Sequence, residues 1–237
     1  MFCVWLRYAG PPAGGAATER GFRGMDELRF AELLCSRLCH DLVSPIGAIN
    51  NGVELLEEFG GGGSDEAMGL IASSGRQAAR RLQFYRVAFG LAGSQVVQSV
   101  GDVRSLLGGM LEGGKVTLEW DEGAVRAPEI AGWGKLLMNM VALAGESLVR
   151  GGTLKVTVVL EADQARMSVS AAGAGCRLHE DIRQALDPAV PVEALNARGA
   201  QPHFTTRLAA RMGGKLEIAE PGQDRMTFAV SLPIGAA

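Results

Sequence analysis

His40 is the residue whose type and position best suit nucleophilic chemistry. The chain has three histidines, His40, His179 and His203, and only His40 lies inside a segment with a strong helical pattern. Neutral imidazole is abundant near pH 7 because its unperturbed pKa is about 6.5, and its unprotonated ring nitrogen can attack phosphorus. The alternative is an exposed histidine without a chemical role. We assign no chemistry to His179 or His203.

The segment around His40 has the apolar spacing of a long amphipathic helix that begins near Met25. Apolar residues recur every seven positions, with others between them, and form a coiled-coil-like seam. They are Leu28, Cys35, Leu42, Ile49 and Leu56, with Leu38, Ile46 and Val53 between them. With Leu42 at heptad position a, His40 falls at position f, on the side turned away from the seam. The pattern therefore predicts a helix that holds His40 in solvent.

The residues that follow His40 favour the approach of another protein. Ser44 and Gly47 share its helix face and are small, so they leave the imidazole unshielded. Pro45 has no backbone N–H, which frees the carbonyl of Asp41 and predicts a slight kink in the helix.

A second helix follows and predicts a helical hairpin. Gly60–Gly63 ends the first helix, and Ser64 followed by Asp65 and Glu66 is typical of a capped helix start. Because the linker is short, the two helices are expected to be antiparallel. One hairpin covers only one face of each seam, so we expect it to pair with a second copy in a four-helix bundle. The sequence therefore predicts a homodimer.

The pattern changes after Gly93 to one of mixed helices and strands. Helices are predicted at 102–111, 132–150 and 203–212, and strands at 115–120, 153–160, 166–170, 215–219 and 225–232. The fold class is α+β: a helical hairpin over residues 25–92, then an α/β sandwich over residues 96–237. Residues 1–24 are rich in Gly, Pro and Ala without an apolar period, and we expect a disordered tail there.

Composition excludes several classes of function. The formal net charge of −3 provides no electrostatic footprint for nucleic acid. No apolar run reaches the roughly 18 residues that a membrane-spanning helix needs. Four cysteines without framework spacing predict reduced thiols and a cytoplasmic location. Cys35 and Cys39 lie four residues apart near His40, but no fourth ligand is close in sequence, so core cysteines are favoured over a metal site.

Residues 38–45, LCHDLVSP, have the His-acidic-Leu-x-x-Pro form and resemble the phosphoacceptor box of two-component histidine kinases. The longer string LLCSRLCHDLVSPIGAINNGVELLEE is similar to the dimerisation and phosphotransfer helix of histidine phosphotransferases. This resemblance implies that His40 carries a phosphoryl group at Nε2 and that Asp41 orients or polarises it. The alternative for Asp41 is a solvated helix charge. The implied receiver-docking surface consists of Arg37, Val43, Ser44 and Gly47.

The second half of the chain resembles the ATP-binding domain of the same kinases, with its nucleotide motifs degraded. Asn139 matches the first asparagine of the Asn-rich helix, but Leu143 replaces the Mg²⁺-binding asparagine that follows. Ala171 replaces the adenine-binding aspartate. Pro202 removes an amide from Gly199–Phe204, the segment expected to form the phosphate loop. We therefore predict a degenerate ATPase-like domain that binds no cofactor or metal.

The resulting hypothesis is a histidine phosphotransferase, a phosphoryl carrier rather than an ATP-dependent kinase. His40 would accept phosphate from a receiver aspartate and pass it to a response-regulator aspartate. The resemblance implies, as partners in a cell-cycle relay, the receiver domain of a CckA-like hybrid kinase and CtrA-like and CpdR-like response regulators, with Mg²⁺ supplied by the receiver. Two alternatives remain open: an ATP-dependent histidine autokinase with a divergent nucleotide site, and a non-catalytic dimeric scaffold.

Overall fold

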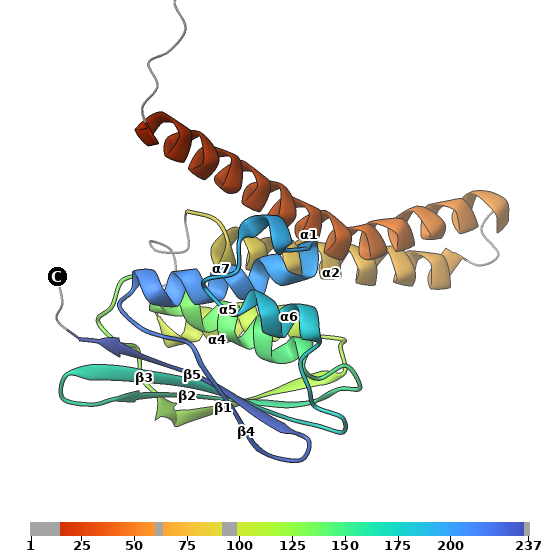
Figure 1. Cartoon of the computed structure of the whole chain (residues 1–237). Coiled ribbons are helices and arrows are strands. Elements are labelled where there is room, and N and C mark those ends of the chain that lie inside the picture. The colour runs from red at the N-terminus through yellow and green to blue at the C-terminus, as the bar shows by residue number, and fades with distance from the viewer. Residues whose placement is uncertain (1–14, 60–63, 92–98, 235–237) are drawn as a thin grey trace, which may run out of the picture.

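The computed structural model describes residues 15–59, 64–91 and 99–234. Two long helices, α1 (Gly15–Phe59) and α2 (Ser64–Ala88), form a hairpin that lies on the helical side of an α/β domain (Figure 1). Helix α1 begins before Met25, so the expectation of a disordered tail is wrong for residues 15–24. Their Ala-Ala-Thr-Glu-Arg stretch contains good helix formers and extends the helix. Residues 1–14 lie outside the described residues.

Small residues allow the two helices of the hairpin to approach each other. A Cβ atom added at Gly52 of α1 would lie 2.6 Å from Cγ1 of Ile71 and 3.2 Å from the carbonyl oxygen of Ala67. Ala67 and Ala78 of α2 are themselves buried. The predicted hairpin is thus present, with glycine and alanine at its closest packing. No helix in the described part of the chain is both long and apolar enough to cross a membrane.

The second domain is a five-stranded sheet with helices on one face (Figure 1). The sheet order is β1-β2-β3-β5-β4; β1 and β2 are parallel and the other neighbours antiparallel. The strands are β1 (Val116–Val125), β2 (Gly152–Leu160), β3 (Gln164–Ala172), β4 (Glu217–Gly222) and β5 (Arg225–Pro233). The helices are α4 (Val100–Leu111), α5 (Trp133–Glu146), α6 (Glu180–Ala185), the short 3₁₀ helix η1 (Val192–Ala194) and α7 (Ala197–Arg211). The α+β fold class is therefore confirmed, although the sequence analysis missed α6 and η1.

Alternation along the strands gives the sheet one buried and one polar face. Val156 of β2, Val169 of β3 and Phe228 of β5 are fully buried beneath the helices. On the other face, the hydroxyls of Thr157 and Ser168 lie 2.7 Å apart. This period-two pattern is typical of an antiparallel sheet covered on one side.

The hairpin and the second domain share one continuous core. Helix α5 lies between the sheet and the hairpin, and nearly all of its residues are buried. At the joint, the Phe204 ring stacks on Phe30 of α1 and meets the edge of Phe89 beyond α2. Lys135 of α5 lies 5.4 Å from the centre of the Phe204 ring and donates a 2.9 Å hydrogen bond to the carbonyl of Gly90. Apolar packing and a cation–π contact therefore hold the two parts together.

The proline in α1 has a specific partner on α2. Pro45 lies inside α1 and cannot donate to the carbonyl of Asp41, four residues earlier. The guanidinium of Arg81 donates a hydrogen bond to that carbonyl instead. Helix α1 also changes direction partway along its length (Figure 1), as expected for a helix with an internal proline. The arginine thus satisfies the backbone group that the proline leaves unpaired.

Gly52→Ala should lower the free energy of unfolding by about 1–3 kcal/mol, because the added methyl group forces Ile71 or the Ala67 backbone to move. Gly69→Ala on α2 is the matched control. Its Cβ would meet nothing within 4 Å, so this change should raise stability by about 0.5–1 kcal/mol through helix propensity. Urea unfolding followed by circular dichroism measures both. A Gly52→Ala protein as stable as the wild type would contradict the close approach.

Arg81→Ala should lower the free energy of unfolding by about 1–3 kcal/mol, because it leaves the backbone carbonyl of the half-buried Asp41 without a hydrogen-bond donor. In a Pro45→Ala background the new backbone N–H at position 45 can pair with that carbonyl, so the same change should cost less. Arg86→Ala, at an exposed position of α2, controls for loss of a positive charge. Equal costs of Arg81→Ala in both backgrounds would show that the arginine does not compensate for the proline.

Candidate functional site

His40 projects from α1 into solvent, as the heptad position predicts. Its side chain is 86% exposed, and its Nδ1 atom lies 3.2 Å from Oδ1 of Asp41. Asp41, by contrast, has only 18% of its side chain exposed. The exposed imidazole is therefore held from one side by a carboxylate that is largely removed from water.

Three side chains surround the Asp41 carboxylate and determine its orientation. Its Oδ2 atom accepts a 3.0 Å hydrogen bond from Nε of Arg37 and another from the hydroxyl of Tyr85 on α2. Its Oδ1 atom faces His40. Asp41 is thus part of a hydrogen-bonded network and not the solvated helix charge that was the alternative interpretation.

The network keeps Asp41 ionised. Burial alone would raise the pKa of Asp41, but the hydrogen bond from Tyr85 and the positive charge of Arg37 outweigh it and lower that pKa below its usual range. Burial and the hydrogen bond to Asp41 raise the pKa of Tyr85, so the phenol stays protonated and continues to donate.

The charge on Asp41 determines which nitrogen of His40 is free. An ionised carboxylate can only accept hydrogen bonds, so the neutral imidazole presents its N–H to Asp41 at Nδ1. Nε2 then keeps its lone pair, on a side chain that is 86% exposed. The geometry therefore favours Nε2 as the nucleophilic atom, in agreement with what the resemblance implied.

Arg37 joins this network to the second domain. While its Nε atom contacts Asp41, its Nη2 atom donates to Oε1 of Glu146, the last residue of α5. Burial alone would lower the pKa of Arg37, but the carboxylates of Glu146 and Asp41 raise it, so the guanidinium stays charged. Sequence reasoning missed both Glu146 and Tyr85. Their pairing with residues of α1 depends on how distant segments pack, and no local pattern marks them.

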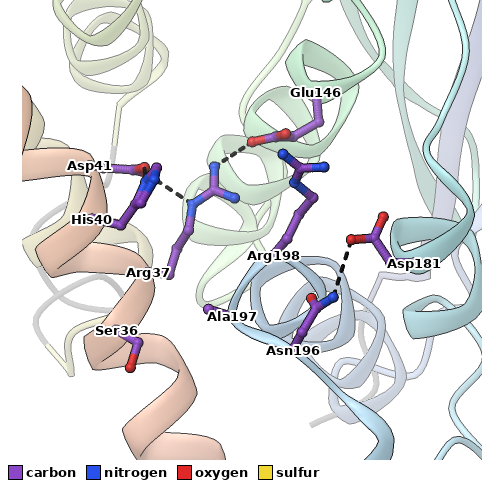
Figure 2. Close-up of a pocket in the computed structure, with 9 residues that line it drawn as sticks. All are labelled: Ser36, Arg37, His40, Asp41, Glu146, Asp181, Asn196, Ala197 and Arg198. Atoms are coloured by element: carbon purple, nitrogen blue, oxygen red, sulfur yellow. Dashed lines mark hydrogen bonds and ion pairs between the residues drawn. The ribbon is translucent and has the colours of Figure 1, made fainter.

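His40 opens onto a cleft of about 710 Å³ between α1 and the second domain (Figure 2). Its α1 wall includes His40, Asp41 and Arg37, and the facing wall comes from the end of α5 and from the α6–α7 region. The full lining consists of Ser36, Arg37, His40, Asp41, Glu146, Asp181, Asn196, Ala197 and Arg198. On the facing wall, Asn196 donates to Asp181 over 3.2 Å and also caps α7 by accepting from the Gly199 amide. A second protein that approaches His40 therefore meets surfaces of both domains.

The four residues expected to form the docking surface differ in their exposure. Val43, with 67% of its surface exposed, and Ser44 lie free on α1. Gly47 is half-buried, with open space where a side chain would project. Arg37 is half-buried and engaged by two carboxylates. The first three are open to a partner, whereas Arg37 acts inside the protein.

Cys35 and Cys39 were expected to be core residues, but both are exposed in the protomer. Among the described residues nothing covers the seam on that side, so the expectation of burial is wrong for a single protomer. Among the described residues, no group of three or more His, Cys, Asp or Glu side chains is placed to hold a metal ion.

The residues at the expected nucleotide site make internal contacts. Asn139 is buried, and its amide donates to the carbonyls of Ala88 and Lys135 at 2.8 and 2.9 Å. Gln201 donates a 2.8 Å hydrogen bond to the Asn139 carbonyl. Leu143 and Ala171 are buried in the core. These side chains therefore hold α5 against α7 and the end of α2.

The segment expected to be a phosphate loop is helical. Gly199–Phe204 lies inside α7, which begins at Ala197 with Asn196 as its cap. Asn196 is a strong N-cap residue, so the helix begins at Ala197 and Pro202 lies inside it, where it cannot donate to the carbonyl of Arg198 four residues earlier. The expectation that this helix starts at His203 is therefore wrong. The backbone amides of this segment are therefore part of a helix and do not form a glycine-rich loop that could bind phosphates.

Comparisons with known proteins show which family the chain resembles. Residues 100–224 match the family described as histidine phosphotransferase C-terminal domain. The chain is 38% identical over 201 residues to the protein phosphotransferase ChpT of Brucella abortus (strain 2308), covering 84% of this chain and 94% of that protein. The histidine kinase AdeS of Acinetobacter baumannii aligns at 11% identity with a TM-score of 0.46, over 83% of this chain and 98% of that one.

A solved structure of a bacterial phosphotransferase superposes with a TM-score of 0.74 at 36% identity, covering 86% of this chain and 96% of the other. Sequence and structural similarity thus extend over both the hairpin and the second domain. The chain belongs to the histidine phosphotransferase family and is a ChpT-like phosphotransferase.

Proposed function

We propose that His40 is the phosphoryl-carrying residue of this phosphotransferase, and that it accepts phosphate from a receiver aspartate and donates it to another. The observation that supports this most is the exposed imidazole whose Nδ1 is held by the ionised Asp41 carboxylate. This arrangement gives His40 a fixed orientation and leaves a free lone pair at Nε2 to act as the nucleophile.

Phosphoryl transfer to and from His40 needs no separate proton acceptor, because no proton leaves the imidazole. The Nε2 lone pair attacks the phosphorus of the aspartyl phosphate, an N–P bond forms, and the P–O bond to the receiver carboxylate breaks, so that the carboxylate leaves with its electron pair. The hydrogen on Nδ1 stays in place, and the positive charge that the ring gains lies next to Asp41. In the second transfer a receiver carboxylate attacks phosphorus, the N–P bond breaks, and its electrons return to Nε2.

The role proposed for the second domain is contact with the receiver rather than use of ATP. The Asn139 amide is already paired with Ala88 and Lys135, and the segment matched to the phosphate loop is helical. Leu143 offers no oxygen to Mg²⁺. These observations disfavour an autokinase. We assign the Mg²⁺ that phosphoryl transfer requires to the acidic pocket of the receiver.

The receiver is proposed to sit over His40 and contact both walls of the cleft. Val43 and Ser44 present an exposed patch on α1, and Arg198 lines the facing wall. The similarity to ChpT makes CckA-like hybrid-kinase receivers and CtrA-like or CpdR-like response regulators the proposed partners, in a cytoplasmic cell-cycle relay.

A homodimer is proposed through the outer face of the hairpin. Large apolar residues at seam spacing are exposed there: Ile46 (47%) and Val53 (41%) on α1, and Met68 (54%) and Leu82 (54%) on α2. An apolar groove of about 670 Å³ that includes Leu42, Leu82 and Phe89 continues this face. A second copy that covers these residues would complete a four-helix bundle, in which coiled-coil-like packing requires both seams to be buried.

His40→Ala should abolish labelling of the chain when it is mixed with receiver domains phosphorylated with ³²P-acetyl phosphate, because the variant lacks the imidazole to which the proposal assigns the attack on phosphorus. His179→Ala, which removes another exposed histidine, should accept and pass on the label like the wild type. Receiver domains from the same genome are tested both as phosphoryl donors and as phosphoryl acceptors. Relay by His40→Ala would favour the scaffold, and labelling of His40 from γ-³²P-ATP alone would favour the autokinase.

The double variant Ile46→Glu/Leu82→Glu should convert the dimer to a monomer in sedimentation experiments, because two carboxylates per chain would be buried without partners in the bundle. Val159→Glu/Leu160→Glu, at exposed apolar positions of β2, is the matched control and should remain dimeric. A wild-type chain that sediments as a monomer at micromolar concentration would contradict the dimer.

A further inference from the structure

Glu146 links the second domain to the phosphotransfer histidine. It ends α5 on the facing wall of the cleft, and its carboxylate accepts a hydrogen bond from Nη2 of Arg37 on α1. The side chains of Arg37 and Glu146 are only 21% and 27% exposed, so bulk water screens this ion pair less than it would on an open surface. The pair is therefore strong enough to influence the orientation of the guanidinium.

A continuous series of contacts leads from Glu146 to the reacting ring. Glu146 binds Nη2 of Arg37, Arg37 donates through Nε to Oδ2 of Asp41, and Oδ1 of Asp41 faces Nδ1 of His40. The guanidinium is a rigid planar fork, and a carboxylate at each end determines the direction of its plane. With one carboxylate removed, the long arginine side chain is free to rotate about its remaining contact, and the charge that lowers the pKa of Asp41 moves with it.

We propose that Glu146 is a positioning residue for phosphotransfer: through Arg37 it holds the Asp41 carboxylate in the orientation that directs the Nε2 lone pair of His40 toward the receiver. This inference rests on the proposed function of His40. The second domain then contributes to transfer directly, by orienting the imidazole, in addition to any contact that it makes with the receiver.

The alternative is that the Arg37–Glu146 pair only fastens the domains together. The joint already has a separate attachment, because Phe204 packs against Phe30 and Phe89, and Lys135 donates to the carbonyl of Gly90. Loss of one ion pair therefore leaves the domains docked. A fastening role predicts a change in stability with no change in the chemistry of the His40 ring.

The kinetic test compares Glu146→Gln with Glu220→Gln. Glu220 pairs with Arg183 at 2.6 Å, both within the second domain and both outside the cleft, which makes it a matched loss of one ion pair. In rapid-quench experiments at saturating phosphorylated receiver, Glu146→Gln should slow the phosphorylation of His40 about 3- to 30-fold, the usual range for a residue that acts through a contact network. The half-saturating receiver concentration should stay near the wild-type value, and Glu146→Asp should recover part of the rate.

Glu220→Gln should behave as the wild type. An unchanged rate for Glu146→Gln overturns the proposal.

A second measurement needs no receiver and separates this inference from the proposed function. The ¹⁵N chemical shifts of the His40 ring at pH 8 report which nitrogen carries the hydrogen. The wild type and Glu220→Gln should show the Nδ1–H form, whereas Glu146→Gln should shift toward a mixture of the two tautomers. Identical ring shifts in Glu146→Gln and the wild type overturn the positioning role. Failure of the wild type to accept phosphate from any receiver would instead overturn the proposed function while leaving the ring measurement valid.

Discussion

The site depends on one carboxylate that stays ionised although most of its surface is removed from water. Asp41 would be costly in that position without partners, because burial opposes its charge. Tyr85 and Arg37 compensate by donating to the same oxygen, Oδ2, and this leaves Oδ1 for the ring of His40. An exposed imidazole on a helix would otherwise sample both tautomers and many orientations. The buried charge beside it selects one tautomer and limits the rotation of the ring.

Asp41 lies close to the place where α1, α2 and the second domain meet. Arg81 of α2 binds the backbone carbonyl of Asp41 that Pro45 leaves free, and Tyr85, one turn further along, binds its side chain. Arg37 extends the network to Glu146 of α5. Residues of α1 and α2 thus bind Asp41 directly, and α5 reaches it only through Arg37. These contacts restrict the motion of His40. In-line attack on the phosphorus of a receiver aspartyl phosphate requires the imidazole to be held in a defined orientation.

The second domain illustrates how a fold persists while its side chains take other roles. Asn139 and Gln201, at positions where the resemblance implies nucleotide contacts, are hydrogen-bonded to each other's helices and to the end of α2. A buried amide must find partners, and here they are backbone carbonyls of the protein. The domain therefore supports α1 and forms one wall of the cleft. The proposed function assigns it no reaction of its own.

Local patterns in the sequence determined the hairpin, the α+β class, the exposure of His40 and the free carbonyl at Asp41, because each follows from spacing within a few turns or from proline's missing N–H. They did not determine α6, the helical start of α7, or the exposure of Cys35 and Cys39. Tertiary structure alone decided that Tyr85 and Arg81 bind Asp41 and that Glu146 binds Arg37. These partners lie 40 to 109 positions from the α1 residues that they contact, and only the packing of α1 against α2 and the second domain brings them within hydrogen-bonding distance.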